Sequence, residues 1–401
     1  MRVSVGDFRL GPEEKAAVNQ VLDSGRLSEG KKVAEFERQF SSFIGVSNCV
    51  ATSSGTGALI CGLEALKHHP SKGIKPGSKI LTTPLTYIAT SNAIVVTGFE
   101  PVYVDVDPDR FIITPETVAE RLEQSDSSDF SLVLPVHLMG YACDMDAINK
   151  TASNHGLSVF EDSAQAHGTL YKGRKTGSLS LLSDFSFYIA HNIQAGEMGC
   201  LVTGDAEIAR LARKIKANGR MCDCLQCVRP EGKCPKLLSY KGEDDFDPRF
   251  THDMVGYNFK TMEFQASLGL SQLKKADWII KRRLENVKYL NDALSRFDDF
   301  IRLPVFDPHV SYLAYPLVVN PEKISRKKLR QELEKRGVET RPLFGCIPTQ
   351  QPAYSSFKKN YLGKLPNAEF LGINAFYVGC HQYLEEKDLD FIAKCFTEIL
   401  G

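Results

Sequence analysis

The feature that most constrains the fold is an alternation of short apolar runs with helical patterns over the first two-thirds of the chain. This alternation is typical of α/β domains, in which helices connect the strands of a mainly parallel sheet. Pro12 and Pro115 stand where first-turn prolines of helices are common, with Thr114 as the predicted N-cap of the second helix. The predicted strands cover residues 49–52, 79–83, 102–106, 132–137, 158–161, 185–188 and 200–203.

The last third of the chain has a different pattern. A helical pattern over residues 262–297 predicts one long helix that leads into a smaller domain. The elements predicted after it are a strand at 312–319, a helix at 327–336 between Ser325 and Gly337, and a last helix at 386–400. We therefore predict a large α/β domain over residues 1–256, including a cysteine-rich loop at 221–235. The bridging helix and a small C-terminal α+β domain would occupy residues 257–401.

Charge and hydropathy exclude some classes of partner. Lysine plus arginine and aspartate plus glutamate number 49 each, and there is no long basic run, which argues against a nucleic-acid partner. The first residues lack the apolar core of a signal peptide. No apolar stretch approaches the roughly 20 residues that span a bilayer. We expect a cytoplasmic protein with no membrane partner.

Two segments have the pattern of an anion site and a ligand crevice. Residues 52–59, rich in Gly, Ser and Thr, follow an apolar strand and open a helix, where backbone amides bind anions such as phosphate. Ser186, a hydroxyl in an otherwise aromatic strand, is a second candidate donor. Asp162 ends another strand, where side chains of a parallel sheet face the ligand crevice. Each residue also has an ordinary structural interpretation: a phosphate-free turn, a core serine or a helix cap.

Together with several other segments, these residues resemble the DegT/DnrJ/EryC1/StrS sugar aminotransferases in order and spacing along nearly the whole chain. The resemblance implies the aspartate-aminotransferase fold, which is fold type I of the enzymes that use pyridoxal phosphate. The remaining matching segments run from Ser28 to Phe40, Pro84 to Thr90, Pro135 to Gly140, Asp144 to Ile148, Gly256 to Met262, Thr340 to Phe344 and Gln351 to Tyr354.

The resemblance also implies roles for individual residues. Gly55, Thr56 and Ser186 would bind the cofactor phosphate. Tyr87 would cover one face of the ring, Asp162 would pair with the ring nitrogen, and Gln165 would support the ring. Asn258 would reach the phosphate from a partner subunit, so a homodimer with shared active sites is expected. Lys260, Arg341 and Phe344 are candidates for substrate binding, although a surface charge explains Lys260 equally well.

His191 occupies the position at which this family carries the lysine that forms a Schiff base with pyridoxal phosphate. An imidazole has no primary amine, and no lysine occurs between Lys175 and Lys214. The side chain predicts a general base of near-neutral pKa and a cofactor held non-covalently, as pyridoxamine or pyridoxal phosphate. The pattern is similar to that of nucleotide-sugar 3-dehydratases, which remove the 3-hydroxyl of a 4-keto-6-deoxyhexose. Those proteins commonly have a second histidine and a glycine where this chain has Asn192 and Met198.

Three other functions stay open at this point. The protein could be an aminotransferase in which glutamate recharges the cofactor while the histidine handles protons. It could be a degenerate aminotransferase fold without chemistry, or a non-catalytic metal-binding or redox-sensing protein on this fold. A deoxy-sugar product, an amino-sugar product and the absence of any cofactor would distinguish these functions.

Four cysteines crowd a short loop: Cys222, Cys224, Cys227 and Cys234. Four thiolates suit tetrahedral zinc or an iron–sulfur cluster, and the spacing does not choose between them. One branch of the 3-dehydratases, like the CDP-4-keto-6-deoxyglucose enzyme, carries a two-iron, two-sulfur cluster that receives electrons from a reductase. A further cysteine of that branch falls in the segment matching residues 161–164, where this chain has none. An iron–sulfur site, a zinc site and free thiols all remain open.

Overall fold

The computed structural model describes residues 3–124, 127–224, 227–242 and 244–401. Its large domain is built on a seven-stranded sheet that is parallel except for β9, which runs antiparallel to both β1 and β8. The order across this sheet is β1 (Asn48–Thr52), β9 (Gly199–Thr203), β8 (Leu182–Ser186), β5 (Ser158–Asp162), β4 (Phe130–Leu134), β2 (Lys79–Thr82) and β3 (Glu100–Tyr103). Each strand predicted in this domain is present, with its bounds shifted by up to three residues.

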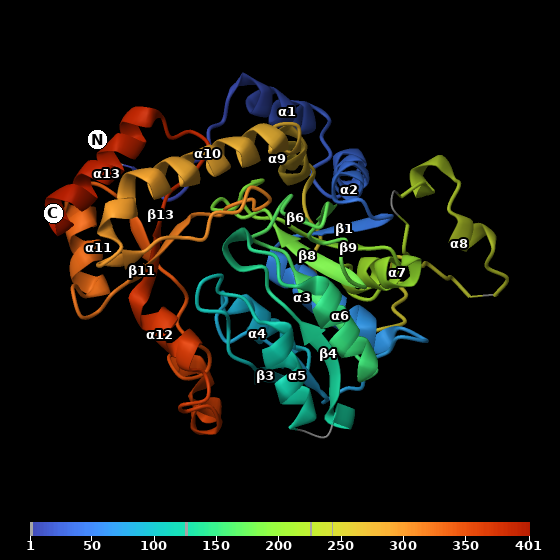
Figure 1. Cartoon of the computed structure of the whole chain (residues 1–401). Coiled ribbons are helices and arrows are strands. Elements are labelled where there is room, and N and C mark those ends of the chain that lie inside the picture. The colour runs from blue at the N-terminus through green and yellow to red at the C-terminus, as the bar shows by residue number, and fades with distance from the viewer. Residues whose placement is uncertain (1–2, 125–126, 225–226, 243) are drawn as a thin grey trace.

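Helices cover both faces of the large sheet (Figure 1). One face packs against α3 (Gly55–His68), α4 (Ala89–Val96) and α7 (Ala206–Ile215). The other face packs against α2 (Lys31–Ile44), α5 (Pro115–Glu123), α6 (Met145–Asn154) and α9 (Glu263–Leu273). Pro115 is the first residue of α5, and the Thr114 hydroxyl accepts a hydrogen bond from the Thr117 amide, as predicted.

The bridging helix predicted as one element is divided into two. Helix α9 ends at Leu273 and α10 (Ala276–Leu294) begins after Lys274 and Lys275. At this break, Lys275 forms an ion pair with Glu14, a buried residue of α1 (Pro12–Asp23). The apolar pattern continues across the break because both helices bury a face, so periodicity alone did not reveal it.

The C-terminal domain has an antiparallel four-stranded sheet flanked by helices (Figure 1). The strand order is β10 (Ile301–Arg302), β11 (Tyr315–Val319), β13 (Ala375–Val378) and β12 (Thr340–Pro342). Its helices are α11 (Arg326–Lys335), α12 (Pro366–Asn374) and α13 (Glu386–Leu400). The Ser325 hydroxyl caps α11, and Gly337 follows the helix with φ of 94°, as the sequence pattern predicted.

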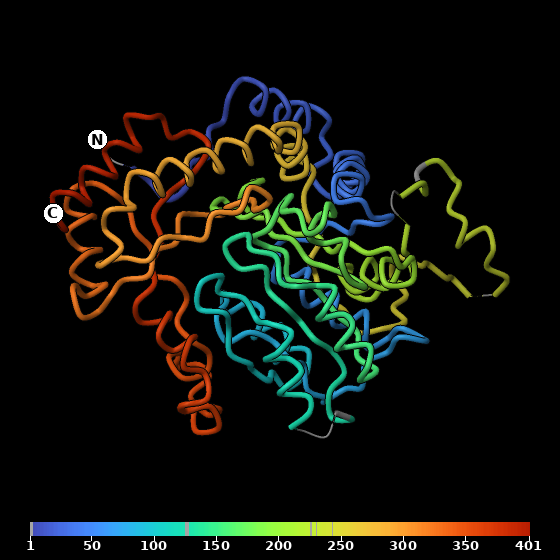
Figure 2. The backbone as a smooth tube through the Cα atoms, viewed as in Figure 1, coloured from blue at the N-terminus to red at the C-terminus, as the bar shows by residue number. Residues whose placement is uncertain are grey.

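The beginning of the described chain lies against the C-terminal domain. Val3 pairs with Val338, and a Cβ atom on Gly379 would lie 2.1 Å from the Ser4 carbonyl oxygen. Figure 2 shows both ends of the chain on the side of the C-terminal domain. The first few described residues therefore tie the two domains together, although the predicted large domain begins at residue 1.

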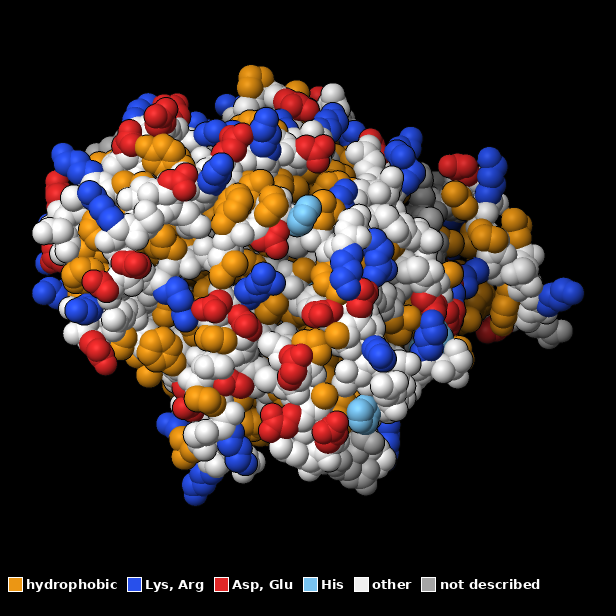
Figure 3. All heavy atoms as spheres, viewed as in Figure 1, with side chains coloured by type: hydrophobic (Ala, Val, Ile, Leu, Met, Phe, Trp, Pro, Cys, Tyr) orange, Lys and Arg blue, Asp and Glu red, His pale blue; other side chains and the backbone are white. Residues whose placement is uncertain are grey.

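The surface agrees with the balanced composition. On the face in Figure 3, acidic and basic side chains are interspersed. Among the described residues, no helix has both the length and the apolarity needed to cross a membrane. The part of the chain that carries α8 (Pro235–Leu238) projects away from the large domain (Figures 1 and 2). It also exposes large apolar side chains, including Leu238, Phe250 and Val255.

Candidate active site

The turn between β1 and α3 forms an anion cradle beside the end of β8. The Ser54 side chain caps α3 by accepting a hydrogen bond of 3.1 Å from the Gly57 amide. The first amides of a helix have no partner within the helix, so those of Gly55 and Thr56 are available to an anion. A Cβ atom on Gly55 would lie 2.7 Å from the Ser186 Cβ. The structure therefore brings together Gly55, Thr56 and Ser186, the three predicted phosphate-binding residues.

Gly199, which sequence reasoning did not single out, holds this turn in place from the start of β9. A Cβ atom there would lie 2.3 Å from the carbonyl carbon and oxygen of Ser54. We predict that Gly199→Ala lowers the free energy of unfolding by about 1–3 kcal/mol, because the turn must move. It should also weaken binding of pyridoxal phosphate. Thermal unfolding and a cofactor titration measure both effects.

Gly204→Ala is the matched control for this prediction, since Gly204 is exposed and a Cβ atom there has no atom within 4 Å. It should change neither the unfolding temperature nor cofactor binding. Equal behaviour of the two variants would contradict the role given to Gly199.

Asp162 is a buried carboxylate at the carboxyl end of β5. Its Oδ2 accepts a hydrogen bond of 2.8 Å from the Thr90 hydroxyl, and its Oδ1 accepts one of 3.2 Å from the Ala164 amide. Burial raises the pKa of Asp162, and these two hydrogen bonds oppose that rise. The two donors favour the ionised form, which is the form that pairs with a protonated ring nitrogen.

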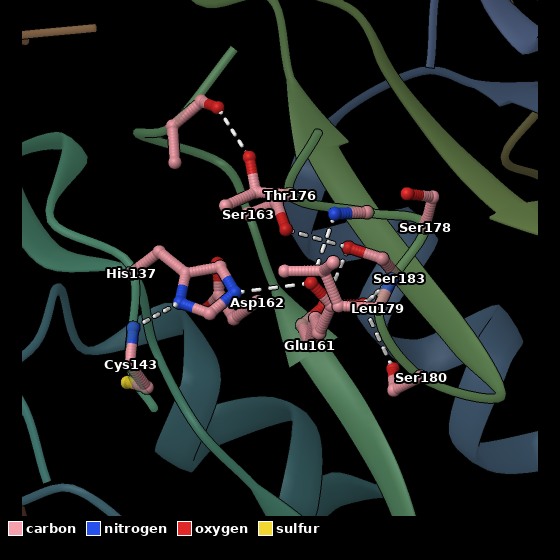
Figure 4. A network of polar contacts seen from close by, with 12 residues as sticks. His137, Cys143, Glu161, Asp162, Ser163, Thr176, Ser178, Leu179, Ser180 and Ser183 are labelled. Carbon is pink, nitrogen blue, oxygen red and sulfur yellow. Dashed lines mark hydrogen bonds and ion pairs between the residues drawn. The ribbon is translucent and has the colours of Figure 1, made fainter. Parts of the chain in front are cut away.

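A buried polar network fixes the strand end that carries Asp162 (Figure 4). The Cys143 amide donates to His137 Nδ1, so the His137 proton lies on Nε2, which donates to Glu161 Oε2 at 3.0 Å. Glu161 also accepts hydrogen bonds from the Gly177 and Leu179 amides and the Ser180 hydroxyl. Both oxygens of Glu161 therefore accept hydrogen bonds, and they connect β5 to the segment at His137 and to the segment at residues 177–180.

Gln165 and Tyr87 each keep one group available to a ligand, which is the side-chain NH2 group in Gln165 and the aromatic ring in Tyr87. Gln165 Oε1 accepts a hydrogen bond of 2.9 Å from the Met139 amide, which directs the Gln165 NH2 group away from that contact. The Tyr87 side chain is 61% exposed, and its ring centroid lies 5.9 Å from that of Phe344. The structure thus brings a predicted cofactor residue of the large domain against a predicted substrate residue of the small domain.

His191 lies in the loop after β8 with its Nδ1 atom buried and without a hydrogen-bond partner among the described residues. Its ring centroid lies 6.1 Å from that of His167, which is completely buried. Burial and the nearby buried Arg283 lower the pKa of His191 to about 3, well below the near-neutral value expected from the sequence. The imidazole is therefore neutral at physiological pH and has a lone pair that can accept a proton.

The loop that carries His191 is anchored to the segment between β10 and β11 of the small domain. The Asn192 side-chain amide donates hydrogen bonds of 3.1 Å to the Ser311 carbonyl oxygen and 2.6 Å to its hydroxyl. Asn192 therefore has a definite tethering contact at the position where 3-dehydratases commonly carry a second histidine. This contact limits the movement of the backbone next to His191.

The lysines nearest to His191 in the sequence are engaged elsewhere. Lys175 donates to the Phe43 carbonyl oxygen at 2.6 Å, and Lys214 forms an ion pair with Asp253. Lys216 is buried and pairs with Glu29. Although burial lowers its pKa, Glu37 and Glu29 raise the value above that of an ordinary lysine. Lys214 and Lys216 are ion-paired ammonium groups and therefore poor nucleophiles. Burial lowers the pKa of Lys175, and the Phe43 carbonyl oxygen holds its amine in place.

The last three residues predicted to bind cofactor or substrate are Asn258, Arg341 and Lys260. Asn258 is exposed and pairs through its backbone with Ala217, a placement that leaves its side chain free. Arg341 forms an ion pair of 3.2 Å with Glu339. Lys260 is half-buried and has no ion pair within the described part of the chain.

The cysteine-rich loop does not assemble the predicted metal site. Cys222 and Cys224 are half-buried, Cys227 is exposed and Cys234 is buried. Apart from residues 225–226 and 243, which lie outside the description, no three His, Cys, Asp or Glu side chains converge as metal ligands. Asp223, between the first two cysteines, instead pairs with Arg210 and Lys236 from either side of the loop. Burial and the neighbouring Cys222 and Cys234 thiols raise the pKa of the Cys224 thiol to about 11, so three of the four predicted thiols lie near one another, and the metal site stays a prediction.

Matches to known proteins cover nearly the whole chain. The model of the DegT/DnrJ/EryC1/StrS aminotransferase family matches residues 9–397. The chain is 30% identical to the dTDP-4-dehydro-2,6-dideoxy-D-glucose 3-dehydratase of Saccharopolyspora spinosa, over 98% of this chain and 85% of that protein. It is also 30% identical to the GDP-perosamine synthase of Caulobacter vibrioides, over 100% of this chain and 98% of the relative.

Solved structures confirm the fold. The GDP-4-keto-6-deoxy-D-mannose-3-dehydratase of E. coli, with bound hydrated pyridoxal phosphate, superposes with a TM-score of 0.85 at 25% identity. The match covers 98% of this chain and 99% of that one. The aspartate-aminotransferase-type α/β fold predicted from the sequence is confirmed, and the chain belongs to the DegT/DnrJ/EryC1/StrS aminotransferase family of pyridoxal-phosphate enzymes.

Proposed function

We propose that this protein is a pyridoxamine-phosphate-dependent dehydratase that removes the 3-hydroxyl of a nucleotide-linked 4-keto-6-deoxyhexose. The observation that carries the proposal is His191 itself, a side chain without an amine at the position that matches the family's Schiff-base lysine. The engaged lysines nearest to it in the sequence support the same conclusion. The relatives named as 3-dehydratases support the reaction type.

The residues of the site fit a pyridoxal-type cofactor. Gly55, Thr56 and Ser186 would hold the phosphate in a cradle that a larger residue at position 55 would fill. Asp162 would face the ring nitrogen, and the exposed ring of Tyr87 would pack on the cofactor ring. When bound, pyridoxamine phosphate supplies an amine that condenses with the sugar ketone and a ring that accepts electrons.

His191 would act as the base, and the proton that it accepts is the one whose removal leads to loss of the 3-hydroxyl. Its Nδ1 is buried, so Nε2 is the ring nitrogen left to meet the reacting carbon. A neutral imidazole with its proton on Nδ1 has a lone pair on Nε2, and this lone pair would accept the proton that the reaction removes. Asn192, through its bonds to Ser311, would hold the loop in register during this transfer.

Amine transfer is the second candidate, because the equally similar GDP-perosamine synthase is named for an amino-sugar product. In this reading glutamate recharges the cofactor and His191 handles protons. The two reactions differ in their products: a dehydratase replaces the 3-hydroxyl with hydrogen, whereas an aminotransferase replaces the ketone oxygen with an amine. Both reactions require the same phosphate cradle.

Mass spectrometry of the products tests the proposal. Purified protein would be incubated with pyridoxamine phosphate, glutamate and a panel of GDP-, dTDP- and CDP-linked 4-keto-6-deoxyhexoses. We expect a product that is lighter than the substrate by one oxygen atom. A nitrogen-containing sugar as the sole product would establish amine transfer instead. No cofactor binding at all would favour a non-catalytic role.

Two further expectations belong to this proposal. Asn258 would complete the site of a partner subunit in a homodimer, which its exposed position supports. An iron–sulfur or zinc site in the cysteine-rich loop, with electrons from a reductase, stays a prediction, and no step of the proposed reaction runs through it. An anaerobic absorption spectrum with iron, sulfide and zinc analysis tests the metal site.

A further inference from the structure

Asp184 in β8 is a buried carboxyl group without a partner. Its residue is 0% exposed, and neither carboxylate oxygen has a hydrogen bond with any described residue. Burying an unpaired polar group costs free energy, and burying an unpaired charge costs far more. By contrast, Glu161 in the adjacent strand is also buried but accepts hydrogen bonds from His137, Ser180 and two backbone amides.

Asp184 is the register partner of Asp162. Strands β5 and β8 are parallel neighbours, with Asp162 opposite Asp184 and Glu161 opposite Ser183. Side chains of register partners point to the same face of a sheet. That face also carries Ser186, two residues beyond Asp184, and packs against α3 at the phosphate cradle. Asp184 therefore lies between two groups that the proposed function assigns to the cofactor.

Two neighbouring buried carboxyl groups do not both ionise, because like charges repel in a medium of low polarity. Asp162 has two donors, from Thr90 and Ala164, whereas Asp184 has none. Burial and the charge of Asp162 raise the pKa of Asp184 well above its ordinary value. The Cys200 thiol also interacts with Asp184, and a thiol supplies no positive charge. Asp184 is therefore the protonated member of the pair.

We propose that Asp184 and Asp162 form a carboxyl pair that holds one proton, with Asp184 as the neutral acid that keeps Asp162 ionised toward the cofactor ring nitrogen. The protonated Asp184 can turn its O–H toward the Asp162 carboxylate, and Asp162 then faces the ring with its negative charge intact. Asp184 is thus a positioning residue. Its assignment rests on the proposed function, since it presumes that Asp162 meets a ring nitrogen.

The first test uses the cofactor-free protein. Because Asp184 keeps a proton that the unfolded chain releases, the folding equilibrium constant of the wild type should fall up to tenfold per pH unit above about 4. This fall continues until the raised pKa of Asp184 is reached. Asparagine has no acidic proton, so the stability of Asp184→Asn should lack this pH-dependent loss. The unfolding temperature of Asp184→Asn relative to that of the wild type should therefore increase as pH rises. Asp184→Thr, which suits a strand, should behave in the same way.

Glu161→Gln is the matched control, because it removes a satisfied buried carboxylate from the same pair of strands. Glu161→Gln should lower the unfolding temperature at neutral pH, whereas Asp184→Asn should raise it. Parallel pH curves for the wild type and both Asp184 variants would overturn the proposed proton-sharing pair.

The second test reads the cofactor directly. Nuclear magnetic resonance of pyridoxamine phosphate labelled with nitrogen-15 in the ring reports ring-nitrogen protonation. Asp184→Asn is again uncharged and can still donate to Asp162, so its ring nitrogen should titrate as in the wild type. In Asp184→Ala, which has no side-chain donor, the ring nitrogen should lose its proton at lower pH than in the wild type. An unchanged midpoint in Asp184→Ala would overturn the role toward the ring. If the wild type fails to bind pyridoxamine phosphate, the proposed function fails, and the stability test still decides whether the proton-sharing pair exists.

Discussion

His191→Lys should convert the protein into one that binds pyridoxal phosphate covalently and no longer deoxygenates its substrate. The introduced amine can form an imine that borohydride reduces to a stable adduct, whereas the wild-type imidazole cannot. The proton-transfer contribution of a positioned general base is typically 10²–10⁴-fold, so deoxygenation should fall by about that factor. Intact-protein mass spectrometry detects the adduct, and product analysis measures the loss.

His191→Asn separates the two effects. It removes the base without adding an amine, so it should lose deoxygenation to a similar extent and form no adduct. Binding of pyridoxamine phosphate should stay close to that of the wild type, because the phosphate cradle and Asp162 are unchanged. Full deoxygenation in either variant would show that another group transfers the proton.

Asp162→Asn should have the second largest effect. The cofactor ring accepts electrons best when its nitrogen is protonated, and the buried Asp162 carboxylate is the residue placed to keep it so. Loss of one preorganised electrostatic contact in an active site typically costs about 10²–10³-fold in turnover. We expect a decrease of this size in kcat. The protein should remain folded, because the Ala164 amide can still donate to the asparagine oxygen and the Thr90 hydroxyl can accept a hydrogen bond from the asparagine NH2 group.

Asp146→Asn serves as the control for charge removal, since Asp146 is exposed and pairs with Lys172 on the surface. Its kcat should match that of the wild type. A wild-type kcat in Asp162→Asn would show that Asp162 does not face the ring, and the carboxyl pair with Asp184 would then lose its proposed purpose.

Much of the fold was predictable because it depends on local patterns. Alternating apolar runs located the strands of the large sheet, and the Ser325 cap and Gly337 bounded α11 because capping is decided within a few residues. The break between α9 and α10 was missed because an ion pair with Glu14, distant in the sequence, accompanies it. The antiparallel direction of β9 was also invisible, since strand direction depends on how the chain returns to the sheet.

The residues of the candidate site also divide into those that the sequence could indicate and those that depend on contacts between distant segments. Gly55, Asp162, Ser186 and His191 were singled out by the resemblance to the sugar aminotransferases, and their roles stay predictions. The steric demand on Gly199 was missed because it arises from the backbone of Ser54 and Gly55 on another strand. Asp184 precedes the strand predicted at 185–188 and was not singled out, and its importance appears only when Asp162 is seen beside it in the sheet.

The amino-acid order alone therefore determined the α/β architecture, the family and the lack of a lysine at position 191. The architecture follows from periodicity, the family from the resemblance of the quoted motifs to those of the sugar aminotransferases, and the last from a side chain that has no amine. The tertiary structure decided which titratable groups are buried and in which direction burial shifts their pKa values. Those properties depend on burial and on neighbours brought together by folding, such as Arg283 beside His191 and Asp162 beside Asp184.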